Sequence, residues 1–81
     1  MTAQPINFFT RTEYSGHNAL TLSQAKYKSE EWATYKQWLE GGYQVQKGEH
    51  GQGIMKIVED KNGEKRPKYY KVFNIEQVKE V

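Results

Sequence analysis

Hydrophobic residues in the first half of the chain recur at helical spacing. Ala19, Leu22 and Ala25 lie three residues apart and follow Asn18, a residue type favoured at helix N-caps. This spacing predicts a first helix over residues 19–27.

A second helix is expected to end at the glycine pair 41–42. Two starting points fit: Ser29, which precedes two glutamates, or Thr34, whose spacing to Gln37 is that of a capping box. With the earlier start, several large apolar residues share one helix face: Trp32, Tyr35, Trp38 and Leu39. We interpret this aromatic stripe as core packing, because large rings are usually buried.

From residue 43 onward, hydrophobic and polar residues alternate, which is typical of strands. The alternation predicts strands at residues 43–46, 53–59 and 67–73. The last two flank Asn62-Gly63, a dipeptide typical of two-residue hairpin turns. The sequence therefore predicts a β-hairpin with this dipeptide as its turn.

A two-residue turn fixes which side chains share a face of the hairpin. One face, interpreted as the core side, holds Met55, Ile57, Tyr70 and Val72. The other face holds Ile54, Lys56, Tyr69, Lys71 and Phe73. Because both sets contain large apolar residues, the sequence leaves open which face is buried.

These elements predict an α+β fold with two N-terminal helices followed by a three-stranded antiparallel sheet. A short C-terminal helical turn, capped by Asn74, completes the predicted fold. Residues 1–13 show no sustained period, so we expect an irregular N-terminal arm with its two phenylalanines against the body. A single domain is then expected over residues 14–81.

The composition limits the possible classes of protein. Eighty-one residues suffice for one small domain, and the absence of cysteine excludes disulfides and thiolate zinc sites. The N-terminus lacks a signal peptide, and no apolar stretch is long enough for a membrane span. We therefore expect a cytoplasmic protein without membrane association.

The charges are unevenly distributed, although the net charge of +2 is small. From residue 61 onward there are six Lys or Arg residues and three acidic residues. The C-terminal third is thus the basic part of the chain, which favours contact with an anionic partner there.

Residue patterns for catalysis or cofactor binding are not found. His17 and His50 are far apart in sequence, in predicted loops, and no His-Glu-x-x-His spacing occurs. No grouping of a nucleophile with a base is indicated, and the glycine-rich segment 47–53 leads into a strand rather than a helix. We predict a protein that is not an enzyme and holds no metal or other cofactor.

The second face of the hairpin, by contrast, suits a nucleic acid. Lys56, Tyr69 and Lys71 are expected side by side there, with Lys65, Arg66 and Lys68 near the turn. Bases of a single strand can stack on such rings while phosphates contact the cations, whereas a duplex offers no free base faces. Exposed lysines also protect strand edges from aggregation, so the pattern alone has a structural alternative.

Four segments, in order, resemble the N-terminal domain of ArdC-type antirestriction proteins and related plasmid primases. They are residues 14–22 (YSGHNALTL), 32–37 (WATYKQ), 42–49 (GYQVQKGE) and 70–77 (YKVFNIEQ). The resemblance implies single-stranded DNA binding, in a setting where plasmid or phage DNA entering a cell is protected from restriction. Many family members continue into a metallopeptidase-like domain with a His-Glu-x-x-His motif, which this sequence lacks.

The candidate nucleic-acid-binding residues were selected by their chemistry. The leading candidates are Lys47, Lys56, Arg66, Lys68, Tyr69 and Lys71, followed by Tyr14, Tyr43 and Lys65. Single-stranded DNA is the expected partner, with RNA as an alternative because no pattern for reading a 2′-hydroxyl distinguishes them. A different class of function stays open: a protein-docking module that uses the aromatic stripe or an exposed sheet edge.

Overall fold

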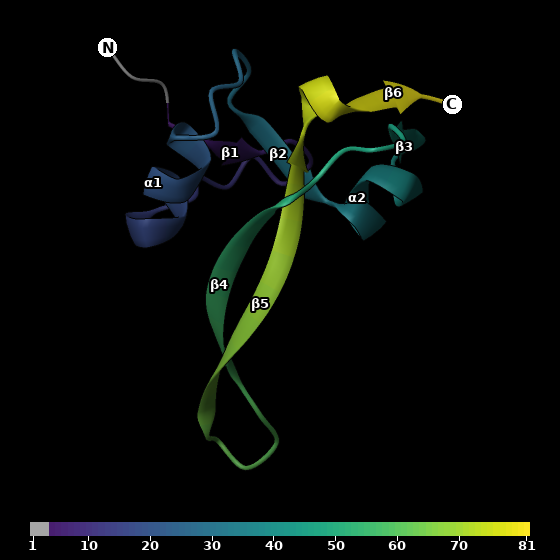
Figure 1. The fold of residues 1–81 in the computed structure, drawn as a ribbon. Helices are drawn as coiled ribbons and strands as arrows, with labels where there is room; N and C mark the ends of the chain where they lie inside the picture. The colour runs from purple at the N-terminus through teal and green to yellow at the C-terminus, as the bar shows by residue number, and fades with distance from the viewer. Residues whose placement is uncertain (1–3) are drawn as a thin grey trace.

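The chain is mostly β-sheet in the computed structural model, which describes residues 4–81. Within these residues the elements, in chain order, are β1 (Ile6–Asn7), α1 (Gly16–Ser23), β2 (Glu31–Thr34), α2 (Tyr35–Glu40), β3 (Tyr43–Val45), β4 (Gln52–Glu59), β5 (Lys65–Asn74), the 3-10 turn η1 (Ile75–Gln77) and β6 (Val78–Glu80). They are arranged as one four-stranded sheet in the order β1-β2-β5-β4 and one two-stranded sheet of β3 and β6 (Figure 1). The predicted α+β fold, with two helices followed by a three-stranded sheet, is therefore wrong.

The main error lies in residues 31–34, which would be helical if the second helix began at Ser29 and which instead form β2. This strand pairs antiparallel with β5, with Ala33 opposite Phe73. Neighbouring side chains on β2 enter different cores, because side chains alternate across a strand: Trp32 belongs to one cluster and Ala33 to the other. Two-sided burial removes the polar alternation by which a strand is recognised.

The four-stranded sheet is covered on both faces near the C-terminal end of β5 (Figure 1). On one face, α1 contributes to a core of Tyr14, Leu22, Trp32, Ile54 and Val72. On the other, α2 and the small sheet contribute to a core of Ala33, Trp38, Phe73 and Val78. Two small cores thus fix β2 and the upper part of β5.

The second helix starts at the later of the two predicted positions. Thr34 caps it: its hydroxyl accepts from Gln37 N at 3.2 Å, while Gln37 Oε1 accepts from Thr34 N at 3.0 Å. Trp32 and Trp38 are both buried, as core packing predicts, but one lies on β2 and the other on α2. The aromatic stripe is therefore not a single helix face. Tyr35 and Leu39 are 51 and 48% exposed, so the core interpretation is wrong for these two residues.

The first helix begins before Asn18 and ends at Ser23, so Asn18 is not its N-cap. Its amide instead binds the backbone of β4: Nδ2 donates to Met55 O at 2.8 Å, and Oδ1 accepts from Met55 N at 3.0 Å. Asn18 thereby occupies the open edge of β4 as a neighbouring strand would.

The N-terminal segment contains a strand, in contrast to the expected irregular arm. Residues 6–7 form β1 and pair parallel with β2. Phe8 then packs against Trp38, with ring centroids 5.1 Å apart. Parallel pairing with a distant strand has no local sequence signal, because it depends on a partner more than twenty residues away.

The hairpin forms, but its turn and register differ from the prediction. Gly63 N donates to Asp60 O, and Asp60 N donates to Glu64 O, which leaves three loop residues rather than two. The Asp60 carboxylate accepts from the backbone N of Asn62 and of Glu64, and Gly63 has a φ of 80°. Met55 is consequently opposite Tyr69.

A one-residue shift of register changes which residues share a face. Ile54, Lys56, Lys68, Tyr70 and Val72 now lie on one face. Met55, Ile57, Tyr69 and Lys71 lie on the other, so the predicted sharing of a face by Lys56, Tyr69 and Lys71 is wrong. At the base of the hairpin it is the Ile54 and Val72 face that enters the core around Trp32.

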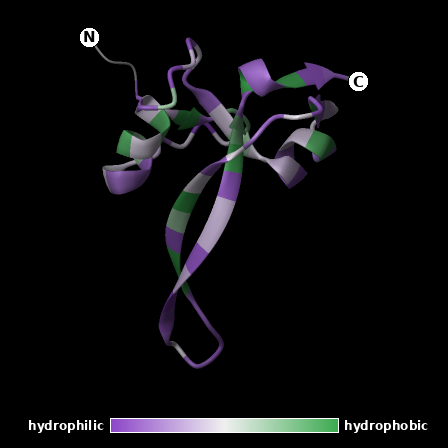
Figure 2. Ribbon diagram, viewed as in Figure 1, coloured by the Kyte–Doolittle hydropathy of each residue, from purple (hydrophilic) through white to green (hydrophobic). Residues whose placement is uncertain are grey.

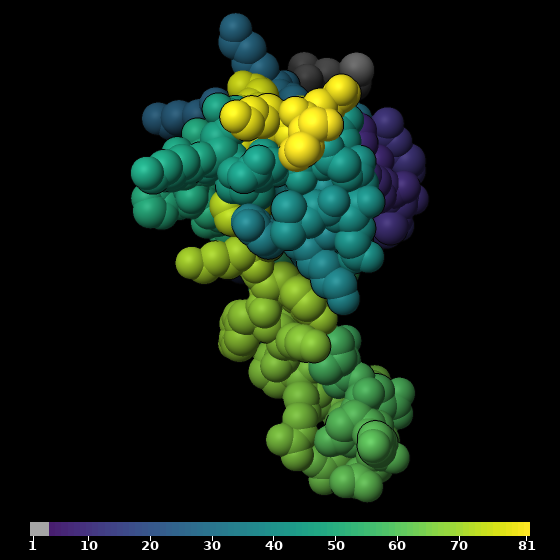
Figure 3. All heavy atoms as spheres, turned by 90° about the vertical axis from the view of Figure 1, so that its right-hand side faces the viewer, coloured from purple at the N-terminus to yellow at the C-terminus, as the bar shows by residue number. Residues whose placement is uncertain are grey.

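Most of the hairpin projects from the rest of the molecule, which we call the body (Figures 1 and 3). We call residues 55–71 the finger. The radius of gyration, 13.3 Å, exceeds the value of about 12 Å expected for a compact chain of this length. No helix within residues 4–81 is long and apolar enough to cross a membrane.

The C-terminal turn is short and capped as predicted. Asn74 Oδ1 accepts from Glu76 N, and Gln77 Oε1 accepts from Asn74 N. Gln77 Nε2 also donates to His50 O at 2.8 Å, which ties the loop between β3 and β4 to η1. The glycine-rich segment 47–53 is thus a corner between strands.

Candidate nucleic-acid interface

The finger carries the excess positive charge of the protein. Residues 55–71 contain six Lys or Arg and three Asp or Glu, so their net charge is +3, whereas the remaining residues sum to −1. A charge of this sign on a narrow projection is accessible to an anionic chain from several directions.

Two lysines on the finger face each other directly across the strands. Lys56 on β4 pairs with Lys68 on β5, and their Nζ atoms lie 5.8 and 5.5 Å from the centroid of the Tyr70 ring. Like charges directly opposite in a sheet destabilise it, although the cation–π contacts offset part of this cost. We call Lys56, Lys68 and Tyr70 the cationic face.

The finger lysines are free of ion pairs with carboxylates among residues 4–81. Arg66, in contrast, is held at the tip by Asp60 and Glu64, each at 3.1 Å. Arg66 is therefore less available to a phosphate than Lys56, Lys65, Lys68 or Lys71.

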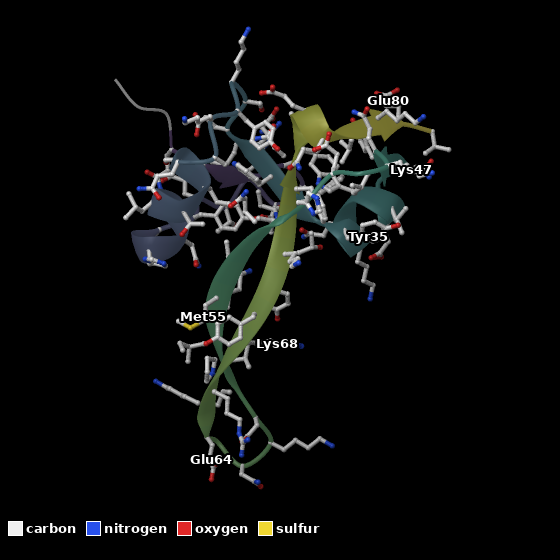
Figure 4. The ribbon with its side chains drawn as sticks, in the orientation of Figure 1. Tyr35, Lys47, Met55, Glu64, Lys68 and Glu80 are labelled. Carbon is white, nitrogen blue, oxygen red and sulfur yellow. The ribbon has the colours of Figure 1, made fainter. Side chains whose placement is uncertain are left out.

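The opposite side of the finger is apolar and exposed. Met55, Ile57 and Tyr69 are 41, 57 and 73% exposed, and Tyr69 lies directly opposite Met55. We call these three residues the apolar face. Figure 4 shows Met55 and Lys68 pointing to opposite sides of the finger, and Figure 2 shows hydrophobic stretches of β4 outside the body.

A groove of about 500 Å³ opens where the cationic face meets the body. We call it the root groove. Its walls come from four separate parts of the chain, namely the N-terminal segment, α1, the start of α2 and the base of the hairpin. They include Asn7, Glu13, Tyr14, Asn18, Thr34, Gln37, Ile54, Lys56 and Tyr70.

Hydrogen bonds fix the polar floor of the root groove. Asn7 Nδ2 donates to the Tyr14 hydroxyl at 3.1 Å and to Gln37 Oε1 at 2.9 Å. Asn7 Oδ1 accepts from the backbone N of Phe9 and of Thr10. Burial raises the pKa of Tyr14, and the hydrogen bond from Asn7 opposes this effect only in part.

The predicted site residues divide into two groups. Lys56, Lys65, Arg66, Lys68, Tyr69 and Lys71 are all exposed on the finger, but they lie on both of its faces. Lys47 lies in the body beyond β3, away from the finger (Figure 4). Tyr43 packs in the body against Trp38, and Tyr14 is buried with its hydroxyl at the root groove.

The predicted site residues did not include Tyr70, Gln37 and Asn18, which line the root groove. Tyr70 was assigned to the core because of the register error. Gln37 and Asn18 were interpreted as helix caps, and no local pattern indicates that both border a groove. Their location follows only from the packing of α1 and α2 around the sheet.

Among residues 4–81, no group of three His, Cys, Asp or Glu side chains is arranged to hold a metal ion. The root groove contains one carboxylate, that of Glu13, and no histidine. The arrangement is suited to binding through rings, amides and lysines.

Comparison with known proteins identifies clear relatives. The family described as the N-terminal domain of anti-restriction factor ArdC matches residues 1–80. Crystal structures of the antirestriction ArdC protein from the R388 plasmid are similar to the chain: the metal-free structure has 34% identity and a TM-score of 0.76, and the Mn(II)-bound structure has 32% identity and a TM-score of 0.82. Both matches cover 96% of this chain, which spans about a third of the solved proteins. No match is found among curated proteins.

Proposed function

The chain belongs to the family of N-terminal domains of the anti-restriction factor ArdC, and from this premise we propose that it binds single-stranded DNA through its finger. The binding is non-catalytic and depends little on sequence. The cationic face contacts phosphates, and exposed rings of the finger stack with bases.

The observation that carries the proposal is the cross-strand pair of Lys56 and Lys68 beside Tyr70. Two adjacent cations that destabilise the free hairpin gain from a shared anion, because a phosphate relieves their repulsion. The adjacent ring gives a base attached to that phosphate a surface for stacking. A solubilising role requires no such pairing of like charges.

The preference for a single strand follows from the rings. Tyr69 is 73% exposed on the apolar face, and Tyr70 is partly exposed on the cationic face. Base faces are available in a single strand and are covered by stacking in a duplex. A duplex offers phosphates to the lysines but no base to either ring.

We further propose that the biological role is antirestriction, by covering DNA that enters a cell. The net charge of the finger, +3, argues against mimicry of DNA, which requires an acidic surface. In a longer protein, a metallopeptidase-like domain would follow this one, and metal-dependent chemistry would belong to that domain. The proposed location is the cytoplasm.

Docking of another protein is the rival proposal from a different class. The two tryptophans of the aromatic stripe do not support it, because Trp32 and Trp38 are 1 and 0% exposed. The open edge of β4 and the apolar face are the surfaces that a protein partner would use. The two proposals therefore differ in whether the cationic face is required.

Fluorescence anisotropy with a labelled mixed-sequence oligonucleotide tests the proposal, first single-stranded and then annealed. We expect tighter binding of the single strand, and at least a tenfold loss with Lys56→Glu and Lys68→Glu combined. This reversal keeps like charges opposite each other, so it conserves the repulsion within the hairpin. A matched reversal of Lys28 and Lys79 in the body is expected to have a much smaller effect. Equal losses in both variants, or no binding of either DNA form, would refute the proposal.

A further inference from the structure

We propose that the root groove is a pocket for one unstacked nucleobase, and that it selects a base with a carbonyl oxygen next to a ring N–H, namely thymine, uracil or guanine. The inference rests on the proposed function and adds a specific site to it. One selective position is compatible with low sequence dependence, because the other nucleotides on the finger are held by phosphate contacts and stacking.

The groove has the size and position that such a base requires. Its volume, about 500 Å³, lies within the range of roughly 300–1,000 Å³ typical of small-molecule pockets. Lys56 and Tyr70 belong both to the groove and to the cationic face. A strand whose phosphate lies between Lys56 and Lys68 therefore has an adjacent nucleotide at the mouth of the groove.

Gln37 provides a hydrogen-bond donor with a fixed orientation. Its Oε1 accepts from Thr34 N and from Asn7 Nδ2, so two donors define which end of the amide is oxygen. Its Nε2 has no hydrogen-bond partner within residues 4–81. Because every buried side-chain N or O atom among these residues has a partner, Nε2 is not buried. The Nε2 group therefore has access to solvent and can donate to a ligand.

Tyr14 provides a second donor on the same floor. Its hydroxyl accepts from Asn7 Nδ2, and within the described part of the chain its own proton has no acceptor. Burial raises the pKa of this hydroxyl, which keeps the proton in place at neutral pH. Two donors in one groove match a carbonyl oxygen, which has two lone pairs.

A base fits the groove better than a phosphate. Glu13 contributes a carboxylate to the lining, which repels a phosphate and accepts from a ring N–H. Thymine, uracil and guanine present a carbonyl oxygen next to a ring N–H, whereas cytosine and adenine present an amino group next to an unprotonated ring nitrogen. The amino group would face the Gln37 donor and leave both without an acceptor.

The test compares labelled oligodeoxyuridine with oligodeoxycytidine of equal length, because uracil and cytosine differ mainly on this edge. We expect the unmodified protein to bind the uridine oligomer roughly tenfold more tightly. Gln37→Glu keeps the oxygen that accepts from Thr34 N and replaces the donor by a second oxygen, so the preference should vanish or reverse. Gln44→Glu, which adds the same charge on β3, should leave the ratio unchanged.

Tyr14→Phe is a second variant that keeps the ring and removes one donor, and it should reduce the preference without removing binding. Equal affinity of the unmodified protein for the two oligomers would overturn the pocket and leave the proposed function standing. Failure to bind either oligomer would overturn both the base pocket and the proposed function. An unchanged ratio in Gln37→Glu would show that the selectivity arises elsewhere.

Discussion

Replacing Lys68 by glutamine is expected to stabilise the free protein and to weaken its complex with DNA. Lys68 lies directly opposite Lys56 on the exposed finger, and among residues 4–81 neither lysine forms an ion pair with a carboxylate. Glutamine retains a polar side chain with part of the aliphatic stem and removes one of the two repelling charges. The two effects therefore have opposite signs, which is unusual for a structural residue.

Both magnitudes follow from the cross-strand geometry. Relief of the like-charge repulsion raises the free energy of unfolding by about 0.2–1 kcal/mol. Loss of the cation–π contact between Lys68 and Tyr70 subtracts from this gain. Each phosphate contact to a single strand contributes about 0.7 to the slope of log K against log salt, so replacing Lys68 lowers the slope by about 0.7. When the salt concentration rises fourfold, the loss of affinity is therefore about 2.6-fold smaller for Lys68→Gln than for the unmodified protein.

Urea unfolding gives the stability, and anisotropy titrations at several salt concentrations give the slope. Lys28→Gln serves as the control, because it removes the same charge from the body. The reasoning fails if the finger variant is less stable than the unmodified protein. It also fails if its salt slope matches that of the control.

Three further predictions concern residues that hold the fold and the groove. Gln77→Leu removes the donor to His50 O and the acceptor of the buried Asn74 N, so urea unfolding should show a loss of about 3 kcal/mol, and an unchanged stability would contradict this role. Asn18→Ala removes both hydrogen bonds to the Met55 backbone, which should speed amide hydrogen exchange at Met55 while exchange in β6 stays as slow as before. Tyr14 has a raised pKa, so its contribution to stability is complete below its ordinary value of 10.0 and is lost as the pH rises through the raised value. Between about pH 8 and about pH 11, the unfolding temperature should therefore fall less steeply with pH in Tyr14→Phe than in the unmodified protein. Parallel curves of unfolding temperature against pH would exclude this effect.

The parts of the fold that were predictable from the sequence have local signals. The capping box of Thr34 and Gln37 lies within four residues, and the hairpin is bounded by alternating strands. The turn type was missed because the Asp60 carboxylate binds two backbone N–H groups and favours a three-residue loop over the two-residue loop typical of Asn-Gly. That single residue shifted the register and exchanged the faces.

The parts that were not predictable depend on distant partners. Strand β2 is short, is buried on both sides and pairs with β5 across some forty residues. The charged finger could be located from composition, because its lysines are close in sequence. The root groove could not, because its walls join segments that only the finished fold brings together.

The central claim is that DNA binds to the finger, and amide chemical-shift mapping of the labelled domain tests it most directly. On titration with a single-stranded oligonucleotide, the account predicts shifts at residues 55–71 and around Gln37 and Tyr14, with little change in β3 and β6. Shifts that concentrate on the exposed side of α2, at Tyr35 and Leu39, with an unperturbed finger would contradict it.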